Sequence, residues 1–369
     1  MRRPRVVVLR GHSANPWELR AWELLADRYE VVVGTTGSNV HDLSGLALPT
    51  VPAPALRDRL PRGRAGQLAA LALGDRYLRL EQTLAGADVV HSAELGVWFA
   101  GQPAALKERL GFRLVLTIWE TIPFLDSFRG FRGRPQRRLA LEQADLFLAA
   151  TERARRCLVL EGAPASRIEV SPPGIDVARF RSAAPASSGG PHVIVSPGRL
   201  VWEKGHYDVL RALALLGGSH RLLIVGTGPE RDRLLRYAAE LGVGERVEVR
   251  AVPYEEMPSV FAHASCIVLA SLPTRLWEEQ FGMVLAEALA AGAPIVASDS
   301  GAIPEVLNGS GAALFRAGDW TGLARLLAEG PLSHARALRL AYPDELVHRY
   351  SIDAAAERLA AAYRRVLEA

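Results

Sequence analysis

Short apolar runs alternate with amphipathic segments along both halves of the 369-residue chain. The runs have the length of β-strands, and the segments between them have helical length and spacing. In the first half the runs fall at 6–9, 31–33, 89–90, 114–118 and 146–148. In the second half they fall at 193–195, 222–225, 247–249, 267–269 and 294–297. Buried strands that alternate with helices are typical of parallel sheets, so the pattern predicts an α/β fold with two doubly wound sheets.

The length of the chain and one low-complexity segment indicate how it divides. A chain of 369 residues exceeds one ordinary domain. The segment Arg181–Pro191, RSAAPASSGGP, has no apolar period and is rich in small residues, as linkers are. We therefore expect an N-terminal domain over 1–180, a linker over 181–191 and a C-terminal domain over 192–350. The rest, 351–369, contains an amphipathic helix. The sequence is compatible with packing of this helix on the first domain but does not require it.

Several classes of protein are disfavoured by the sequence. No run of about 18 residues lacks charge, so we expect no transmembrane helix. The start, MRRPRVVVLRG, has an apolar run of only Val6–Leu9 and no cleavage site, so we interpret it as a first strand and expect a cytoplasmic protein. Cys157 and Cys266 belong to no metal-ligating cluster, and we expect two inert core thiols and no metal site.

Basic residues are concentrated in the first half. Residues 1–190 hold 26 Lys+Arg against 19 Asp+Glu, a surplus of 7, and the rest holds 18 against 21, a deficit of 3. Two segments are rich in arginine, Leu56–Arg64 and Phe128–Arg138, and in the second the arginines interleave with phenylalanine. They suit contact with an anionic partner or the inner face of a membrane, or they are solvated basic loops. The arginines of the second segment are Arg129, Arg132, Arg134, Arg137 and Arg138. No nucleic-acid-binding module accompanies them.

The loop after the first strand of the second half carries two cations. In SPGRLVWEKG, Arg199 and Lys204 are five positions apart. A planar guanidinium and a compact ammonium together suit a diphosphate. Lysine occurs elsewhere only at Lys107, so its use here asks for a reason. The alternative is an exposed basic loop.

Glycine-rich turns follow two of the expected strands. Gly226 and Gly228 lie in IVGTGPE, where they would let the backbone approach a ligand. Gly11, in RGHS, ends the first strand and could offer its N–H to phosphates. Each turn alone is a weak signal, because such turns are common in α/β folds.

The stretch WEEQFGMVLAEALAAGAPIVASDSGAIPEV, 277–306, places acidic and glycine residues around a helix and a strand. Gly282 permits a tight turn after Glu279, and Glu287 falls inside the helix expected over Met283–Ala291. Carboxylates at these positions suit hydroxyl pairs of a ribose and a sugar, or they are ordinary solvent-facing charges. Backbone N–H groups after the strand, at Ser300 and Gly301, precede a helix expected near 304 and suit an anion.

Together these motifs and SPPGIDVARF, 171–180, resemble the retaining glycosyltransferases of family 4, whose GT-B fold sets two Rossmann-like domains across a cleft. The resemblance implies that Glu279 contacts the donor hexose and Glu287 the ribose, and that Arg199 and Lys204 bind the diphosphate. It implies that main-chain N–H groups of Ser300, Gly301 and Ala302 contribute. It also implies a nucleoside-diphosphate sugar as donor substrate, no cofactor or metal, retention of configuration, and a small-molecule, glycan or lipid-linked acceptor, as in carbohydrate or natural-product biosynthesis.

The base of the donor is left open. Val252, in VPYEEM after an expected strand, is a candidate for the base pocket. The segment does not select between uracil and guanine.

One position departs from the family. Many members have a histidine after a first-domain strand, where VLTIWET here places Trp119 and Glu120. Trp119 could stack on a sugar or acceptor, and Glu120 could act as a base or orient a hydroxyl, or both could be structural. His91 follows another strand and suits a packed residue better than a catalytic one. Alternatives to a transferase are an epimerase of the same fold and a noncatalytic sugar-nucleotide binder.

Overall fold

The computed structural model describes residues 2–61, 63–125, 133–183, 189–336 and 338–369. The chain forms two compact units, Met1–Gly174 with Ile352–Ala369, and Ile175–Ser351. The division lies before residue 180, where we expected the first domain to end, because helix α8 (Val177–Arg181) packs on α11 (Met257–His263) and α12 (Met283–Ala290). Residues 184–188 of the expected linker lie outside the described residues.

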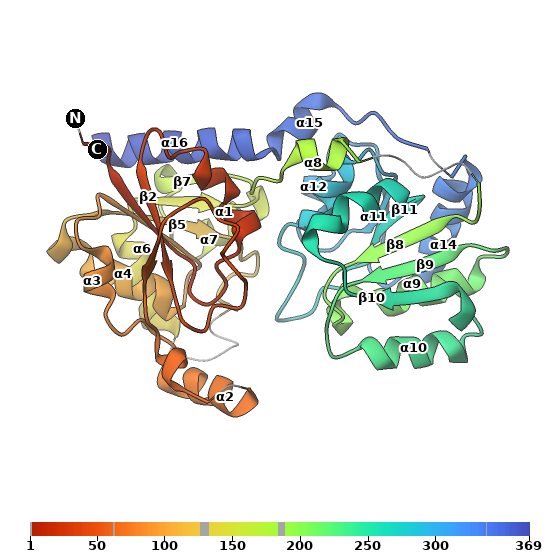
Figure 1. The fold of residues 1–369 in the computed structure, drawn as a ribbon, viewed down its shortest axis with the longest axis horizontal. Coiled ribbons are helices and arrows are strands. Elements are labelled where there is room, and N and C mark those ends of the chain that lie inside the picture. Colours follow the sequence, from red (N-terminus) through yellow and green to blue (C-terminus); the bar gives the residue numbers. More distant parts are fainter. Residues whose placement is uncertain (1, 62, 126–132, 184–188, 337) are drawn as a thin grey trace. The chain divides into compact units, whose positions relative to one another are not determined.

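The first unit is built on a seven-stranded parallel sheet in the order β3-β2-β1-β4-β5-β6-β7 (Figure 1). Five strands coincide with the apolar runs, and β3 and β7 were not predicted. These two are short edge strands with partly exposed residues, so they lack a continuous apolar run. The strands are β1 (Arg5–Leu9), β2 (Glu30–Thr35), β3 (Thr50–Pro52), β4 (Val89–Ala93), β5 (Arg113–Ile118), β6 (Leu146–Ala149) and β7 (Ile168–Val170).

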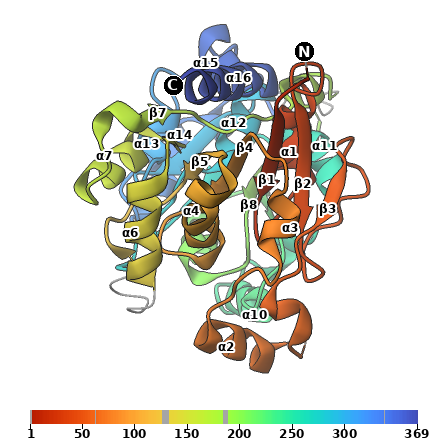
Figure 2. The ribbon, with the colours of Figure 1, turned by 90° about the vertical axis from the view of Figure 1, so that its left-hand side faces the viewer.

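Helices cover both faces of this sheet (Figure 2). On one face α1 and α16 pack together, with Trp22 and Tyr363 in the core between them and the sheet. On the other face the core takes its helical residues from α3, α4, α6 and α7. The helices are α1 (Pro16–Glu23), η1 (Leu56–Arg59), α2 (Arg64–Leu73), α3 (Leu80–Leu84), α4 (Trp98–Leu110), α6 (Gly133–Gln143), α7 (Glu152–Leu160), η2 (Ala165–Arg167) and α16 (Ile352–Glu368).

The second unit has a six-stranded parallel sheet in the order β10-β9-β8-β11-β12-β13. Its strands are β8 (Val193–Pro197), β9 (Arg221–Val225), β10 (Val247–Arg250), β11 (Cys266–Leu269), β12 (Ile295–Ser298) and the unpredicted β13 (Ala313–Phe315). The remaining helices are η3 (Trp202–Lys204), α9 (His206–Leu215), α10 (Arg231–Glu240), η4 (Gly244–Arg246), η5 (Tyr254–Glu256), α13 (Ile303–Val306), α14 (Trp320–Glu329), η6 (Pro331–Ser333) and α15 (Asp344–Arg349).

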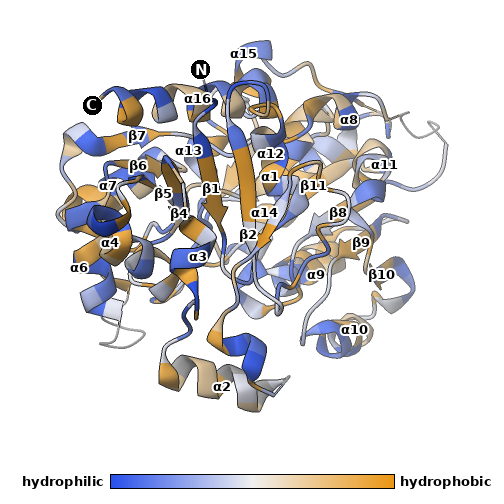
Figure 3. Ribbon diagram, turned by 60° about the vertical axis from the view of Figure 1, so that its left-hand side comes forward, coloured by the Kyte–Doolittle hydropathy of each residue, from blue (hydrophilic) through white to orange (hydrophobic). Residues whose placement is uncertain are grey.

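Both sheets reverse their strand order beside the first strand, at β1/β4 and β8/β11. In open parallel sheets ligands bind outside the carboxyl ends of the strands at such a point. Strands β1 and β2 are hydrophobic along most of their length in Figure 3, whereas the covering helices carry both kinds of residue. Among the described residues, no helix is both long and apolar enough to cross a membrane.

Candidate functional site

Apart from Glu287, which lies on α12, the expected site residues of the second unit lie in segments that follow strands of one parallel sheet, at the edge formed by the strands' carboxyl ends. Arg199 and Lys204 follow β8, and Val252, which is partly buried, follows β10. Glu279 lies between β11 and α12. The Ser300–Ala302 turn follows β12. The fold thus gathers residues that are up to about a hundred positions apart.

Lys204 and Glu279 form an ion pair that is largely shielded from solvent. The Lys204 Nζ lies 2.6 Å from Glu279 Oε2, and the Ser271 hydroxyl donates to the same oxygen at 2.6 Å. The ammonium also lies 5.0 Å from the centre of the Trp277 ring. Arg199 is exposed, and no described residue pairs with its guanidinium. The strand edge therefore presents the unpaired guanidinium of Arg199 beside a fixed cation–carboxylate pair.

Glu287 lies on α12 with only 3% of its surface exposed. Its Oε1 accepts a hydrogen bond from the Tyr254 hydroxyl at 2.7 Å. Arg179 stacks 4.9 Å from the centre of the Tyr254 ring and donates from Nη2 to the Tyr254 carbonyl oxygen at 2.9 Å. Burial raises the pKa of Glu287 to about 7, although the Tyr254 hydroxyl and the charge of Arg179 act to lower it. The carboxyl is thus held in place by groups from η5 and α8.

The turn after β12 packs directly against the backbone of Glu279. Gly301 has a φ of +56°, and a Cβ there would lie 2.1 Å from the Glu279 carbonyl oxygen. The Ala302 N–H donates to that same oxygen at 2.8 Å, so this N–H is not available to a ligand, contrary to what the family resemblance implied. Among the described residues, the N–H groups of Ser300 and Gly301 have no acceptor, and the buried Ser300 hydroxyl has no partner.

The expected helix near residue 304 is α13, which is only four residues long. So short a helix contributes little macrodipole. Any anion at this turn would depend on the individual N–H groups. The helix over Met283–Ala290, in contrast, ends one residue before its expected end.

The glycines after β9 are explained by a neighbouring loop. A Cβ on Gly226 would lie 1.9 Å from the Gly198 carbonyl oxygen, and one on Gly228 would lie 2.4 Å from that of Leu200. The loop after β8 donates to the loop after β9, from the Leu200 N–H to the Thr227 carbonyl oxygen at 2.8 Å. These glycines let two backbones approach each other, and approach to a ligand is not needed to account for them.

A buried histidine steadies the loop that carries Arg199. Its Nε2 lies 3.1 Å from the Arg199 carbonyl oxygen and its Nδ1 lies 2.8 Å from the Ser196 hydroxyl. This residue, His206, is 1% exposed, and burial lowers its pKa to about 4. At neutral pH it is therefore an uncharged brace for the loop.

In the first unit, the expected role of Gly11 does not fit the structure. The Gly11 N–H donates to the Tyr77 hydroxyl at 3.1 Å. A Cβ on Gly11 would lie 2.6 Å from the Phe99 ring, and its φ is +57°. The glycine is required by packing, and its N–H is not available to a phosphate.

Trp119 and Glu120 follow β5, beside a glutamate that was not among the expected site residues. The Trp119 N–H donates to Glu94 Oε1 at 3.0 Å. Glu94 has a φ of +65°, a left-handed conformation that is costly for a residue with a side chain. Burial raises the pKa of Glu94 to about 7, with a further contribution from the charge of Glu120. The available signal was its place directly after β4, in HSAE.

The Glu120 carboxylate folds back on its own loop. Its Oε1 accepts the N–H groups of Thr121 and Ile122, both at 2.9 Å. This geometry supports the structural alternative for Glu120. His91 is fully buried between the hydroxyls of Tyr363 and Thr117, at 2.6 and 2.7 Å, and is a packed residue.

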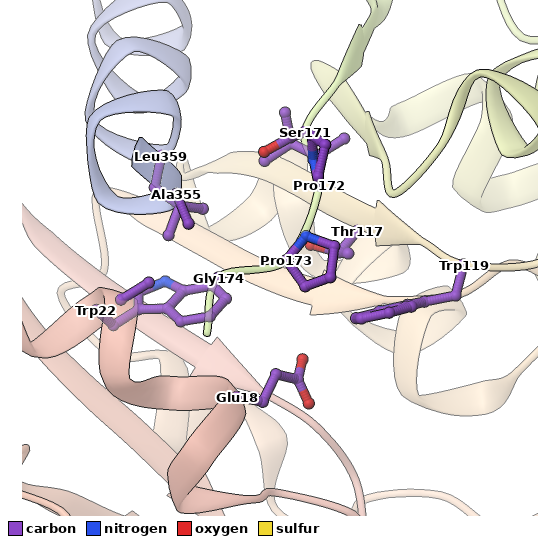
Figure 4. A pocket seen from close by; sticks show the side chains of 12 residues that line it. Glu18, Trp22, Thr117, Trp119, Ser171, Pro172, Pro173, Gly174, Ala355 and Leu359 are labelled. Atoms are coloured by element: carbon purple, nitrogen blue, oxygen red, sulfur yellow. The ribbon is translucent and has the colours of Figure 1, made fainter. Parts of the chain in front are cut away.

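A pocket lies at the carboxyl end of β5 in the first unit (Figure 4). Trp119 points into it, and Pro172 and Pro173, which follow β7, form another side. Glu120 does not line it. The lining residues are Glu18, Ala21, Trp22, Thr117, Trp119, Leu148, Ser171, Pro172, Pro173, Gly174, Ala355 and Leu359.

The arginine-rich segment around residue 130 is described only in part. Arg129 and Arg132 lie outside the described residues. Arg137 stacks 4.8 Å from the centre of the Phe124 ring, which indicates a packing role, whereas Arg134 and Arg138 are exposed on α6.

Both cysteines are buried, and burial raises the pKa of each thiol. Within the described ranges, no three His, Cys, Asp or Glu side chains gather where they could hold a metal ion.

Comparison with known families identifies both units. Residues 20–179 match the model of Glycosyltransferase Family 4, and residues 179–330 match that of Glycosyl transferases group 1. The chain belongs to glycosyltransferase family 4. Among solved structures, Anabaena HepE in complex with UDP and glucose is similar to this family 4 chain with a TM-score of 0.75 at 19% identity, over 98% of this chain and 100% of HepE. The fold is therefore GT-B, with two Rossmann-like domains.

Curated relatives share more sequence with this family 4 chain. A D-inositol 3-phosphate glycosyltransferase of Nocardia farcinica is 34% identical over 51% of this chain and 46% of its own length. A GDP-mannose-dependent alpha-(1-6)-phosphatidylinositol monomannoside mannosyltransferase of Mycolicibacterium smegmatis is 35% identical over 49% of this chain and 52% of its own length. The matched region thus spans about half the length of these relatives.

Proposed function

We propose that this protein transfers a hexose or related sugar from a nucleoside-diphosphate sugar to an acceptor, with retention of configuration and without a metal ion. The observation that carries the proposal is the Lys204–Glu279–Ser271 cluster, together with the buried Glu287 of α12, which is held by Tyr254 after β10 of the same sheet. This arrangement combines a cation that can bind a diphosphate with carboxylates that can accept hydrogen bonds from hydroxyl groups. The names of the relatives agree, since one uses GDP-mannose and HepE holds UDP and glucose.

In this proposal each donor group has a partner of suitable chemistry. Arg199 and Lys204 bind the diphosphate and stabilise the charge that develops as it departs. Glu279, oriented by Lys204 and Ser271, accepts hydrogen bonds from the sugar hydroxyls, and Glu287 accepts those of the ribose. The unpartnered Ser300 hydroxyl and the N–H groups of Ser300 and Gly301 supply further donors. Val252 lies beside the base.

In this proposal the anomeric configuration is retained because the acceptor attacks the sugar on the same face from which the diphosphate departs. Glu279 is tied to Lys204 and Ser271, which suits a positioning role better than that of a covalent nucleophile. The acceptor hydroxyl then attacks while the departing phosphate takes its proton, and the reaction depends on positioning and charge stabilisation. Trp119 contributes to the acceptor side, and Glu120 shapes its loop.

We also propose that the exposed Arg134 and Arg138 contact an anionic partner, such as a lipid surface that carries the acceptor. Phosphoinositide-containing vesicles test this in a sedimentation assay. Arg134→Ser with Arg138→Ser should lower the bound fraction, and an unchanged fraction would refute the contact.

A thermal-shift screen tests the donor. UDP-glucose, UDP-galactose, UDP-N-acetylglucosamine and GDP-mannose are each added in excess, and a bound donor should raise Tm. Lys204→Ala should abolish the shift. Lys107→Ala is the matched control, because Lys107 pairs with Asp145 in the other unit. If no donor raises Tm, or if the shift survives Lys204→Ala, the proposed donor site is wrong.

Product analysis tests the chemistry. With the donor that gives the largest shift, transfer from an α-linked donor should yield an α-linked product by NMR, in the presence of EDTA. A β-linked product would refute retention. An epimerised donor without transfer would refute the transferase.

A further inference from the structure

A buried chain of hydrogen bonds in the first unit ends at the pocket beside Trp119. The Trp22 indole N–H can only donate, and it donates to the Tyr363 hydroxyl at 2.7 Å. The Tyr363 hydroxyl must therefore direct its own proton to its other partner, His91 Nδ1, at 2.6 Å. Burial holds the pKa of His91 well below its usual value, so the ring is neutral. With Nδ1 accepting, its single proton is on Nε2.

This assignment of protons determines the role of the Thr117 hydroxyl. His91 Nε2 lies 2.7 Å from Thr117 Oγ1, so the Thr117 hydroxyl accepts this hydrogen bond. Its own proton has no acceptor among the described residues. Thr117 lines the pocket, close to the end of β5. The chain of hydrogen bonds thus leaves an O–H donor available to a ligand.

Glu18, on α1, supplies a hydrogen-bond acceptor to the same pocket. Its Oε1 accepts from Arg10 Nε at 2.9 Å, and within the described ranges no donor reaches Oε2. In Figure 4 the carboxylate points toward Pro173. Because the Arg10 charge balances that of Glu18, the pocket offers an acceptor without net charge, and it holds no unpaired cation for a phosphate.

The walls of the pocket restrict the ligand further. Trp22 and Trp119 lie on either side of Pro173 in Figure 4, and Leu359 and Ala355 of α16 add an apolar side. Aromatic and proline surfaces suit the C–H face of a saturated ring. A hydroxyl can both accept from Thr117 and donate to Glu18, whereas a carbonyl or an ammonium could satisfy only one of them.

We propose that this pocket binds a neutral, hydroxyl-bearing ring, with its C–H face against Trp119 and its hydroxyls on Thr117 and Glu18. The ring belongs to the acceptor, and in this respect the inference rests on the proposed function. All of the lining residues belong to the first unit, so binding requires no donor.

The test uses methyl β-D-glucopyranoside as the probe and saturation-transfer NMR on the full chain without donor. Trp119→Ala should weaken binding about tenfold, and Thr117→Val by about three- to tenfold, as expected for one aromatic contact and one hydrogen bond. Trp98→Ala and Thr35→Val are matched controls outside the pocket and should leave binding unchanged. Glucose 6-phosphate, which adds a charge, should bind no more tightly than the neutral probe.

Two results would overturn the proposal. One is absence of probe binding, or binding that Trp119→Ala and Thr117→Val both leave unchanged. The other is a His91 tautomer protonated on Nδ1 in a ¹⁵N NMR spectrum, which would reverse the chain of hydrogen bonds. Probe binding without any donor-induced rise in Tm would leave the pocket standing and refute the donor site alone.

Discussion

Replacing Glu287 by glutamine should make the protein more stable at alkaline pH, although the residue belongs to the candidate site. Glu287 is buried, and its pKa in the folded protein is about 7 against an ordinary value of 4.5. Between these values the unfolded chain has lost the proton and the folded chain still holds it. Stability therefore falls as pH rises through this interval, by about 3 kcal/mol in full. Glutamine keeps an oxygen for the Tyr254 hydroxyl and does not ionise.

Urea unfolding of both proteins, followed by circular dichroism at pH 5, 6, 7 and 8, measures the effect. Subtracting the unfolding free energy of the parent from that of Glu287→Gln removes the contributions of most other titrating groups, because both proteins share them. It should favour Glu287→Gln by less than about 1 kcal/mol at pH 5 and by about 3 kcal/mol at pH 8. Glu248→Gln is a control at an exposed carboxylate in the same unit and should give a small, pH-independent difference. A Glu287→Gln protein that is less stable than the parent at pH 8 would refute the reasoning.

The same variant should behave in the opposite way toward the donor. If ribose hydroxyls donate to the carboxylate, donor binding favours the ionised form, and the donor-induced rise in Tm should grow between pH 6 and pH 8. In Glu287→Gln this rise should be smaller and independent of pH. A full donor shift in the variant would place the ribose elsewhere, without affecting the prediction for stability.

Three further substitutions test other parts of the structure. Gly301→Ala should abolish the donor-induced rise in Tm and destabilise the protein by about 1–3 kcal/mol, because the added Cβ would meet a carbonyl oxygen. Gly311→Ala is the control: Gly311 also has a positive φ, but no atom lies near the added Cβ, so this substitution should cost only the backbone strain. Tyr254→Phe removes a hydrogen bond that lowers the pKa of Glu287, so the pH dependence attributed to that carboxyl should move to higher pH in urea unfolding. Tyr363→Phe leaves two buried partners unsatisfied and should cost about 1–3 kcal/mol; a loss below 0.5 kcal/mol would contradict the hydrogen-bonding assignment.

The strands that could be predicted are buried along most of their length, apart from the edge strand β10, which has two exposed residues. Each of the ten apolar runs corresponds to a strand, and the helix over Met283–Ala290 was found to within one residue. The missed strands, β3, β7 and β13, are three-residue elements at sheet edges. β3 and β7 have partly exposed residues and no continuous apolar run, whereas β13 lies in the short apolar run AALF, 312–315, which was not recognised as a strand.

The chemistry of the site was less predictable than its location. The motifs place Lys204 and Glu279 at one strand edge. They do not predict the ion pair between the two residues, because that pair depends on how two distant loops meet. Arg179 and Tyr254 hold Glu287 from elements that are remote in sequence. The N–H of Gly11 was assigned to a ligand because its partner, a tyrosine 66 positions away, cannot be inferred from a turn motif.

The return of α16 to the first unit has a consequence for synthesis on the ribosome. Trp22, Tyr29 and the face of the sheet beneath them are covered by α16, which is made only after the whole second unit. Until then this apolar face is open to solvent and to other chains. The second unit, whose residues are continuous in sequence, can complete its core first, so the N-terminal unit is the last to close. Nascent chains that stop before Ile352 should therefore depend on chaperones far more than those that extend through Glu368.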